Sequence, residues 1–273
     1  MRVDIDYGLE HLALDIPEGK LVRAQRQQEA PPLADPSAAV REALTRPLDF
    51  PALKRALTPD DHVVIVLDEC LPKPAELVTP IIEHVLEAHV ALDAITLLEP
   101  IAAPGAWAGN LPARFQSVRL EVHDPRHRDH LSYLATTRRN RRIYLNRTAV
   151  DADQLVVVAR RGYDPLLGYA GCESVLYPGL SDESTRRELA ARLSNAAPGP
   201  VSWPACQESE EVAWLLGAPF FRVASVFEEA VSGATVPPCS ATTAAPHPDL
   251  RNHFKTFQII SKMLQASTGI HLP

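Results

Sequence analysis

The sequence predicts an α/β fold with a mostly parallel sheet flanked by helices. Residues 62–68 (HVVIVLD) form a continuous apolar run, which is typical of a strand buried on both faces. Residues 74–91 then place apolar side chains at helical spacing, and residues 94–98 form a second apolar run. Because strands and helices alternate along the chain in this way, we expect parallel strands joined by helical crossovers.

The segment before this alternation has a different pattern. Residues 3–7 and 12–16 alternate apolar and polar side chains, which predicts a pair of β-strands. Residues 23–32 are rich in glutamine and end in two prolines, and they predict a loop. Asp35 followed by Pro36 predicts the start of a helix, since aspartate caps the first turn and proline fits the first helical position.

The rest of the chain continues the alternation and then changes in composition. Further strands are predicted at 118–122, 143–145, 154–159 and 220–227, and further helices at 183–193 and 209–216. We therefore expect one α/β domain over residues 1–231 and a linker over residues 232–248, where small residues, proline and threonine prevail. A C-terminal helix is expected within residues 249–273, mainly at 249–265, because apolar side chains recur there at helical spacing.

Composition excludes several classes of protein. At 273 residues, with 46% hydrophobic and 22% charged side chains, the chain has the composition of a globular protein. Its formal net charge of −7 gives no electrostatic attraction to nucleic acid, and no apolar stretch is long enough to span a membrane. The acidic N-terminus is unlike a signal peptide, and the four cysteines include no Cys-x-x-Cys pair. We expect a cytoplasmic protein with reduced thiols.

Functional residues are expected directly after the predicted strands. In open parallel sheets, ligands bind in the crevice beyond the carboxyl ends of the strands. The segments that follow Asp68, Leu98, Val122 and Ala159 are therefore the first places where a site is expected.

Several collinear motifs resemble those of one enzyme family. The most specific is residues 168–179 (GYAGCESVLYPG), which match a G-F-S-G-G-x-K-x-x-x-P-G pattern at each glycine and proline except at Cys172. Weaker matches lie at Pro32–Leu53, Leu67–Pro74, Val122–Asp124, Asn146–Asp153 and Glu211–Phe220. On these motifs the chain resembles the nickel-dependent lactate racemases over about residues 5–230.

The resemblance implies the fold of that family's N-terminal domain, with the C-terminal domain shortened or absent. It also implies a racemase of 2-hydroxy acids that works through a nickel pincer nucleotide. In the family, a lysine of the glycine-rich motif binds this cofactor covalently and a later histidine ligates the nickel. The cofactor takes a hydride from the substrate, and two histidines exchange the hydroxyl proton, a role that suits a side chain titrating near neutral pH.

The chain departs from the family at the positions that carry this chemistry. The lysine position is Ser174, and no lysine lies between Lys73 and Lys255. The catalytic histidine that precedes the glycine-rich motif aligns with Asp164, and the nickel ligand aligns near Leu189. The second catalytic histidine has no counterpart. We therefore expect no nickel pincer nucleotide, and we expect the nickel-dependent hydride transfer to have been lost.

The resemblance still marks the family's cleft in this sequence. Its cleft positions include Asp164, which aligns with one catalytic histidine, and His123, which resembles the family's histidine–aspartate pair after a strand; we carry both as candidate catalytic residues. Its cofactor-binding positions correspond to Asp68, Gly168, Gly171, Cys172 and Ser174. Since glycine-rich turns bind anions through backbone N–H groups, a small anionic ligand is expected there. No resident metal and no nucleic-acid or membrane partner is expected, while assembly with further copies of the chain is compatible with the sequence.

Three motifs leave alternatives open. Residues 123–130 (HDPRHRDH) carry imidazole and carboxylate groups at short spacing, as a metal site does, or they form a solvated loop after a strand. Cys172 is either a thiol activated by nearby backbone N–H groups or a small residue where the family has glycine. The arginine-rich residues 138–147 either contact a nucleotide or another anionic ligand, or form a charged surface turn.

Three functions are consistent with these observations. The leading hypothesis is a lactate racemase-like protein that has lost the nickel chemistry and binds a small anion. The second is an isomerase or other enzyme that uses Asp164, His123 and either Cys172 or Glu173, which requires a concave pocket where these side chains converge. The third is a non-catalytic subunit or scaffold, which requires a large apolar surface patch.

Overall fold

The computed structural model describes two compact units of the chain. The described residues are 2–7, 10–15, 17, 35–47, 52–69, 71, 73–100, 107–164, 167–191, 204–217, 220–226 and 256–260. One unit consists of residues 1–32 with 228–240, and the other consists of residues 33–227 with 241–273. This division differs from the predicted single domain over residues 1–231. The predicted linker at 232–248 lies outside the described residues.

The smaller unit contains the β-strand pair expected at the N-terminus. Strands β1 (Arg2–Tyr7) and β2 (Glu10–Asp15) pair antiparallel, from Arg2 opposite Asp15 to Tyr7 opposite Glu10. The alternating pattern at the start of the sequence is thus explained by a two-stranded ladder. The loop predicted at residues 23–32 lies outside the described residues.

The larger unit is built on a seven-stranded, mostly parallel sheet. The six strands of its parallel core are β3 (Val63–Leu67), β4 (Ile95–Glu99), β5 (Arg119–Val122), β8 (Gln154–Asp164), β10 (Phe220–Val226) and β11 (Thr256–Ile260). They lie in the order β11-β10-β8-β3-β4-β5, and each neighbouring pair is parallel. The short strand β9 (Gly168–Ala170) pairs antiparallel with the end of β8. The predicted α/β fold with a mostly parallel sheet is therefore confirmed.

Helices and one hairpin connect these strands. The helices are α1 (Pro36–Thr45), α2 (Pro74–Leu86), α3 (Arg147–Val150), α4 (Cys172–Leu176), α5 (Glu183–Ala190) and α6 (Pro204–Leu215). Helix α1 begins as predicted, because the side chain of Asp35 accepts a hydrogen bond from the backbone N–H of Ala38 at 2.9 Å. The hairpin pairs β6 (Leu131–Thr136) with β7 (Arg142–Asn146). Strand β6 and helix α4 were not predicted from the sequence.

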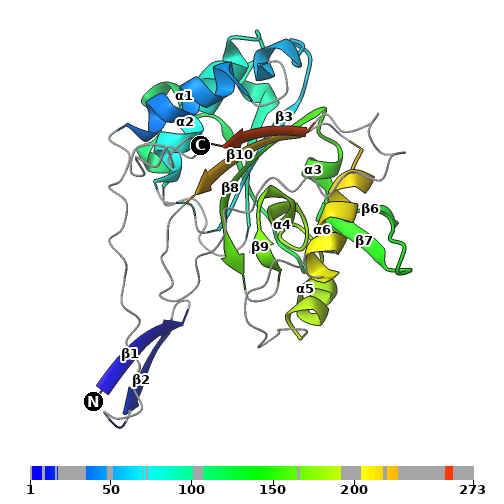
Figure 1. The fold of residues 1–273 in the computed structure, drawn as a ribbon. Helices are drawn as coiled ribbons and strands as arrows, with labels where there is room; N and C mark the ends of the chain where they lie inside the picture. The colour runs from blue at the N-terminus through cyan, green and yellow to red at the C-terminus, as the bar shows by residue number, and fades with distance from the viewer. Residues whose placement is uncertain are drawn as a thin grey trace, which may run out of the picture. The chain divides into compact units, whose positions relative to one another are not determined.

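The sheet is covered by helices on both faces, as Figure 1 shows. The side chains of Val63, Ile65 and Leu67 pack with α1 and α2 on one face. Those of Val64 and Val66 pack on the other face in a second core that includes residues of α3, α4, α5 and α6. All five side chains are at most 2% exposed, which explains why β3 reads as a continuous apolar run. Burying each of them stabilises the fold by roughly 1.5–3 kcal/mol.

Strand β11 occupies residues for which the sequence predicts a helix. Residues Thr256–Ile260 pair in parallel with Phe220–Ala224 of β10, so the prediction of a helix over 249–265 is wrong at these residues. The apolar side chains of this segment fit a helical period, but the sequence TFQII is also rich in β-branched and aromatic side chains, which favour strands. Parallel pairing with β10 gives the backbone of this segment hydrogen-bond partners along one edge, which favours the strand over the helix.

The order of the strands reverses between β3 and β8. Strand β3 is the first strand of this sheet along the chain, and β4 and β5 follow on one side of it. The chain then crosses to the other side of β3, where β8, β10 and β11 follow in order. Such a reversal opens a crevice beyond the carboxyl ends of the two central strands, which is where α/β proteins bind ligands.

Candidate functional site

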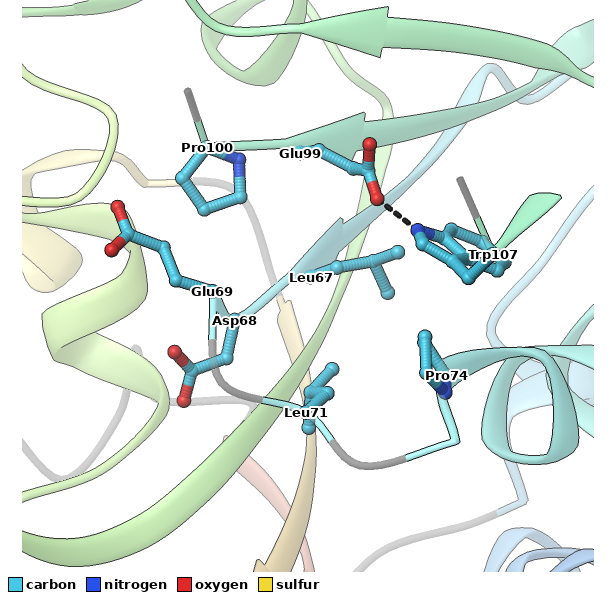
Figure 2. A pocket seen from close by; sticks show the side chains of 8 residues that line it. All are labelled: Leu67, Asp68, Glu69, Leu71, Pro74, Glu99, Pro100 and Trp107. Carbon is cyan, nitrogen blue, oxygen red and sulfur yellow. Dashed lines mark hydrogen bonds between the residues drawn. The ribbon is translucent and has the colours of Figure 1, made fainter. Parts of the chain in front are cut away.

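A crevice opens at the carboxyl ends of β3 and β4, beside the point where the strand order reverses. Its cavity volume is about 240 Å³. The residues that line it are Leu67, Asp68, Glu69, Leu71, Pro74, Glu99, Pro100 and Trp107 (Figure 2). The volume lies below the range of roughly 300–1,000 Å³ that is usual for drug-sized ligands. The crevice therefore suits a ligand of only a few non-hydrogen atoms.

Asp68 links the two central strands at the edge of this crevice. It directly follows β3, and its backbone N–H donates a hydrogen bond to the carbonyl oxygen of Val158 at 2.9 Å. Its carboxylate accepts a hydrogen bond from the backbone N–H of Arg160 in β8, also at 2.9 Å. Asp68 was predicted as a site residue, and it is the only one of the predicted site residues with a described side chain that lines the crevice.

Glu99 and Trp107 form the opposite wall. Glu99 is the last residue of β4 and is only 5% exposed. Its carboxylate accepts a hydrogen bond from the indole N–H of Trp107, drawn as the dashed line in Figure 2. Sequence reasoning missed both residues. An acidic residue at the end of an apolar strand was the available signal, because a buried carboxylate needs a donor nearby.

The crevice has a negative electrostatic character. Among the described residues that line it, three carry carboxylates (Asp68, Glu69 and Glu99) and none is basic. Glu69 accepts a hydrogen bond from the Arg186 guanidinium at 3.3 Å. Lys73, at the start of α2, forms an ion pair with Glu76 at 3.1 Å. An anionic ligand in the crevice would face the carboxylates of Asp68 and Glu99 beside the ion-paired carboxylate of Glu69, whereas a hydroxyl or ammonium group would find acceptors.

The glycine-rich segment is a packed structural element. Gly171 immediately precedes α4, and the Ser174 hydroxyl donates a hydrogen bond to its carbonyl oxygen at 2.6 Å. A Cβ atom at Gly171 would lie 3.5 Å from a carboxylate oxygen of Glu173. The chain thus places its own carboxylate at the start of this short helix, which opposes the binding of a small anion there.

Cys172 lies in the core beneath that segment. Its side chain is 3% exposed, and its thiol donates a hydrogen bond to the carbonyl oxygen of Val157 at 3.6 Å. It packs in the same core as Val175 and Leu176. This environment favours the interpretation of Cys172 as a small core residue over that of an activated nucleophile.

His123 is buried at the end of β5 and supports the backbone around it. Its side chain is fully buried, and its Nε2 atom forms a hydrogen bond with the carbonyl oxygen of Ser181 at 3.0 Å. Its backbone N–H donates to the carbonyl oxygen of Glu99 at 2.7 Å. Burial lowers the pKa of His123, with a smaller contribution from the nearby charge of Arg186. The imidazole therefore helps to hold β5 and the Ser181 segment together in its neutral form.

The residues after His123 form a loop of the kind that the sequence left as one alternative. The Asp124 carboxylate accepts a hydrogen bond from the backbone N–H of Arg126 at 2.9 Å. The rings of His127 and His130 meet edge to face, with centroids 4.1 Å apart. Within the described part of the chain, no group of three or more histidine, cysteine, aspartate or glutamate side chains is arranged to hold a metal ion.

The pKa of His123 predicts how stability depends on pH. Burial lowers the pKa of His123 in the folded state, so below the ordinary histidine pKa of 6.5 the unfolded chain binds a proton at this residue more readily than the folded chain does. The free energy of unfolding is therefore unaffected by His123 titration above pH 6.5. It declines as the pH falls from 6.5 toward the folded-state pKa. We expect denaturant midpoints to fall between pH 7.5 and 5.5, and the slope to flatten in His123→Gln. The matched variant His130→Gln, at an exposed position, is expected to keep the wild-type slope.

The remaining predicted residues do not gather at one pocket. Gly168 pairs with Asp164 where β9 meets the end of β8, and the side chain of Asp164 lies outside the described residues. Neither His123 nor Cys172 lines the crevice. The convergence that an enzyme with altered chemistry requires is therefore not observed for these two side chains.

Comparisons with known proteins give one consistent match. Residues 7–192 match the family model described as the lactate racemase N-terminal domain. The lactate racemase of Thermoanaerobacterium thermosaccharolyticum is 21% identical over 189 residues, which cover 66% of this chain and 44% of that protein. No helix in the described part of this chain has the length and apolar character needed to cross a bilayer.

Solved structures show the same fold. The structure of the lactate racemase apoprotein from that organism matches with a TM-score of 0.61 and 16% identity. The match covers 83% of this chain and 56% of the apoprotein chain. The crystal structure of a Thermotoga maritima protein matches with a TM-score of 0.54 and 14% identity. The match covers 72% of this chain and 53% of the T. maritima chain. The chain thus spans about half the length of the relatives that it matches.

Proposed function

Since the chain belongs to the lactate racemase N-terminal domain family, we propose that it is a member that no longer carries out nickel-dependent racemisation. We further propose that it binds a small polar ligand in the crevice beside Asp68. The protein would act in the cytoplasm, in keeping with its dispersed cysteines.

The observation that carries this proposal is the environment of Ser174. By resemblance, Ser174 stands where the family has the lysine that binds the cofactor. A hydroxyl does not supply the amine, and this one already donates to the carbonyl oxygen of Gly171 at 2.6 Å. No described residue that lines the neighbouring crevice offers an amine either.

The position of the family's nickel-binding histidine also lacks the group that the cofactor needs. Leu189, which aligns near the family's nickel-binding histidine, is fully buried in the core on the α5 side of the sheet. Its neighbour Ala190 carries no ligating group. The residues present in this chain therefore do not fit a nickel pincer nucleotide.

The crevice favours a ligand with hydrogen-bond donors over a carboxylic acid. Asp68, Glu69 and Glu99 supply acceptors, and Leu67, Leu71 and Pro74 supply an apolar wall. A hydroxylated cation or a polyol of a few carbons fits this combination of charge and size. The 2-hydroxy acid expected from the resemblance would place a carboxylate against three others.

Racemase activity tests the first part of the proposal. The protein is co-expressed with the machinery that makes the nickel pincer nucleotide, purified, and incubated with each enantiomer of lactate. We expect no interconversion by chiral chromatography, while the lactate racemase of T. thermosaccharolyticum, prepared in the same host, interconverts both. Turnover that follows the nickel content of the preparation would refute the proposal.

The indole N–H resonance of Trp107 tests the second part. Three compounds of matched carbon skeleton are titrated, namely lactate, propylene glycol and isopropanolamine, which are an anion, a neutral diol and a cation. We expect the Trp107 signal to move with isopropanolamine, less with the diol and not with lactate, while Trp214 on α6 stays in place. A response to lactate alone would contradict the assignment.

Variants in which one carboxylate is replaced by a neutral amide test whether Asp68 itself binds the ligand. Asp68→Asn removes one acceptor charge from the crevice and is expected to weaken isopropanolamine binding by about tenfold or more, the usual value of a hydrogen bond to a charged group. Asp93→Asn makes the same change at an exposed position just before β4, at the opposite edge of the sheet. It is expected to leave the affinity unchanged, and equal losses in both variants would show that only the overall charge matters.

A further inference from the structure

A second cavity lies away from the crevice, between the β6–β7 hairpin and the start of α5. Its volume is about 410 Å³, within the range of roughly 300–1,000 Å³ that is usual for ligand sites. The residues that line this cavity, which we term the arginine groove, are Arg128, Leu131, Arg141, Arg142, Tyr144, Asp182, Ser184, Thr185 and Glu188. Nothing in the resemblance assigns a role to it.

The carboxylates of the arginine groove are already engaged. Glu188 accepts two hydrogen bonds from the Arg141 guanidinium, at 2.6 and 2.7 Å. Asp182 caps α5 and accepts hydrogen bonds from the hydroxyls of Ser184 and Thr185 and from the backbone N–H of Thr185. Burial raises the pKa of Asp182, but these hydrogen bonds outweigh it and lower the pKa overall. Both carboxylates are thus charged and occupied by the chain's own donors.

Two guanidinium groups of the groove have no such partner. Arg128, in the 3-10 turn η6 (Arg128–His130), and Arg142, at the start of β7, are both exposed. Within the described part of the chain, neither forms an ion pair or a side-chain hydrogen bond. Because a guanidinium binds phosphate or carboxylate through two parallel N–H groups, the unpaired charge of the groove selects an anion.

An aromatic surface lies beside these charges. Tyr144 is 38% exposed and contacts Tyr133 across the hairpin, with ring centroids 5.6 Å apart and a tilt of 60°. Leu131 contributes a buried apolar side chain to the same groove. A flat ring of a ligand can stack on the exposed part of Tyr144 while its charged group reaches the guanidiniums.

We propose that the arginine groove binds a small phosphate monoester that carries a flat ring. Arg128 and Arg142 hold the phosphate, whose double charge matches two unpaired guanidiniums, and Tyr144 with Leu131 contacts the ring. Arg141 also lines the groove, but its guanidinium already forms ion pairs with Glu188 and Glu208, so we assign phosphate binding to Arg128 and Arg142 only. The proposal is independent of the ligand in the crevice, which is lined by a different set of residues.

Calorimetric titration of the full chain tests the proposal with three probes. Adenosine monophosphate supplies both the ring and the phosphate, adenosine supplies the ring alone, and inorganic phosphate supplies the charge alone. We expect adenosine monophosphate to bind at least about tenfold more tightly than either part, since each charge-assisted hydrogen bond contributes on the order of a tenfold change in affinity. Binding of adenosine with equal affinity would overturn the assignment of the arginines.

Matched variants identify the groove as the place of binding. Arg128→Gln and Arg142→Gln are each expected to weaken binding of adenosine monophosphate by about ten- to a hundredfold. Arg139→Gln changes an exposed arginine outside the groove. It is expected to change the affinity for adenosine monophosphate by less than about twofold, because surface charges are screened by salt. All three positions are exposed, so folding is preserved. Equal losses in the three variants, or no binding by the unmodified chain, would refute the proposal.

The ring contact has its own test. Tyr144→Ala is expected to weaken binding of adenosine monophosphate by about fivefold or more while leaving inorganic phosphate unaffected, because only the ring stacks on the tyrosine. Tyr144→Phe keeps the aromatic ring and is expected to bind as the unmodified chain does. If Tyr144→Ala binds adenosine monophosphate normally, the ligand lacks the proposed contact and the assignment fails.

Discussion

Replacement of Gly179 by alanine is expected to destabilise the larger unit by more than about 3 kcal/mol, at the upper end of what overpacking costs. A Cβ atom at Gly179 would lie 2.2 Å from the carbonyl oxygen of Val175 and 2.8 Å from its carbonyl carbon. Both are backbone atoms of α4, so no side-chain rotation relieves the clash. The helix or the following turn has to move, and the fully buried Leu176 and Leu180 move with it.

Chemical denaturation of Gly179→Ala and Gly109→Ala measures this effect with an internal control. A Cβ atom at Gly109 would meet nothing within 4 Å, so its replacement is expected to change the free energy of unfolding by less than about 0.5 kcal/mol. Similar stability of the two variants would show that the packing of α4 against this turn is looser than described. The last glycine of the glycine-rich motif is thus explained by packing rather than by a ligand.

Loss of the Arg141 guanidinium is expected to cost about 3–5 kcal/mol, the usual result of leaving a buried charge without its partner. Arg141 donates to Glu208 of α6 at 2.9 Å and to both oxygens of Glu188 in α5. The Glu208 side chain is only 2% exposed, and one of its oxygens has no hydrogen-bond partner among the described residues. In Arg141→Met, the Glu208 carboxylate would therefore be buried without compensation.

A double variant separates the cost of the orphaned charge from the loss of packing. Arg141→Met combined with Glu208→Leu removes both charges and is expected to recover most of the stability, since apolar replacements of buried ion pairs are often neutral. The exposed neighbour Arg139 provides the matched control, and Arg139→Met is expected to change stability by less than about 0.5 kcal/mol. If the double variant is as unstable as Arg141→Met, the ion pair is not the source of the effect.

The core of the sheet could be predicted from the sequence because its signal is local. Strands β3 and β4 are buried on both faces, so β3 is an uninterrupted apolar run and β4 is an apolar run broken only by Thr96 before it ends in Glu99. The C-terminal strand β11 could not be predicted in this way. Its five residues fit two periodicities, and only the free edge of β10, which is distant in the sequence, selects the strand.

The sites were predicted less completely, because they depend on contacts between distant segments. Asp68 was recognised from its place after a strand, whereas Trp107 follows β4 in the next connection and reaches the crevice only through the fold. The arginine groove brings Arg128 of η6 and Arg142 of β7 beside the first turn of α5. The sequence left this arginine-rich segment as either a ligand contact or a charged surface turn. Which arginine is engaged is a tertiary property, since Arg141 forms ion pairs and Arg142 has no partner among the described residues.

The glycine-rich segment illustrates why a preserved motif does not imply a preserved cofactor site. Its glycines and proline form β9, α4 and the turn that follows, and Gly179 is required there by close backbone packing. In the alignment that the resemblance implies, Ser174 stands at the lysine position of this motif.

The mass and metal content of the protein, made alongside the nickel-pincer biosynthetic machinery, decide whether this chain carries the nickel cofactor. Native mass spectrometry with elemental analysis is applied to this chain and, in parallel, to the lactate racemase of T. thermosaccharolyticum as the positive control. We expect an unmodified mass and no nickel for this chain, because Ser174 offers no amine and the Leu189 side chain is fully buried in the core. A stoichiometric nickel-containing adduct on this chain would contradict it and would restore the racemase assignment.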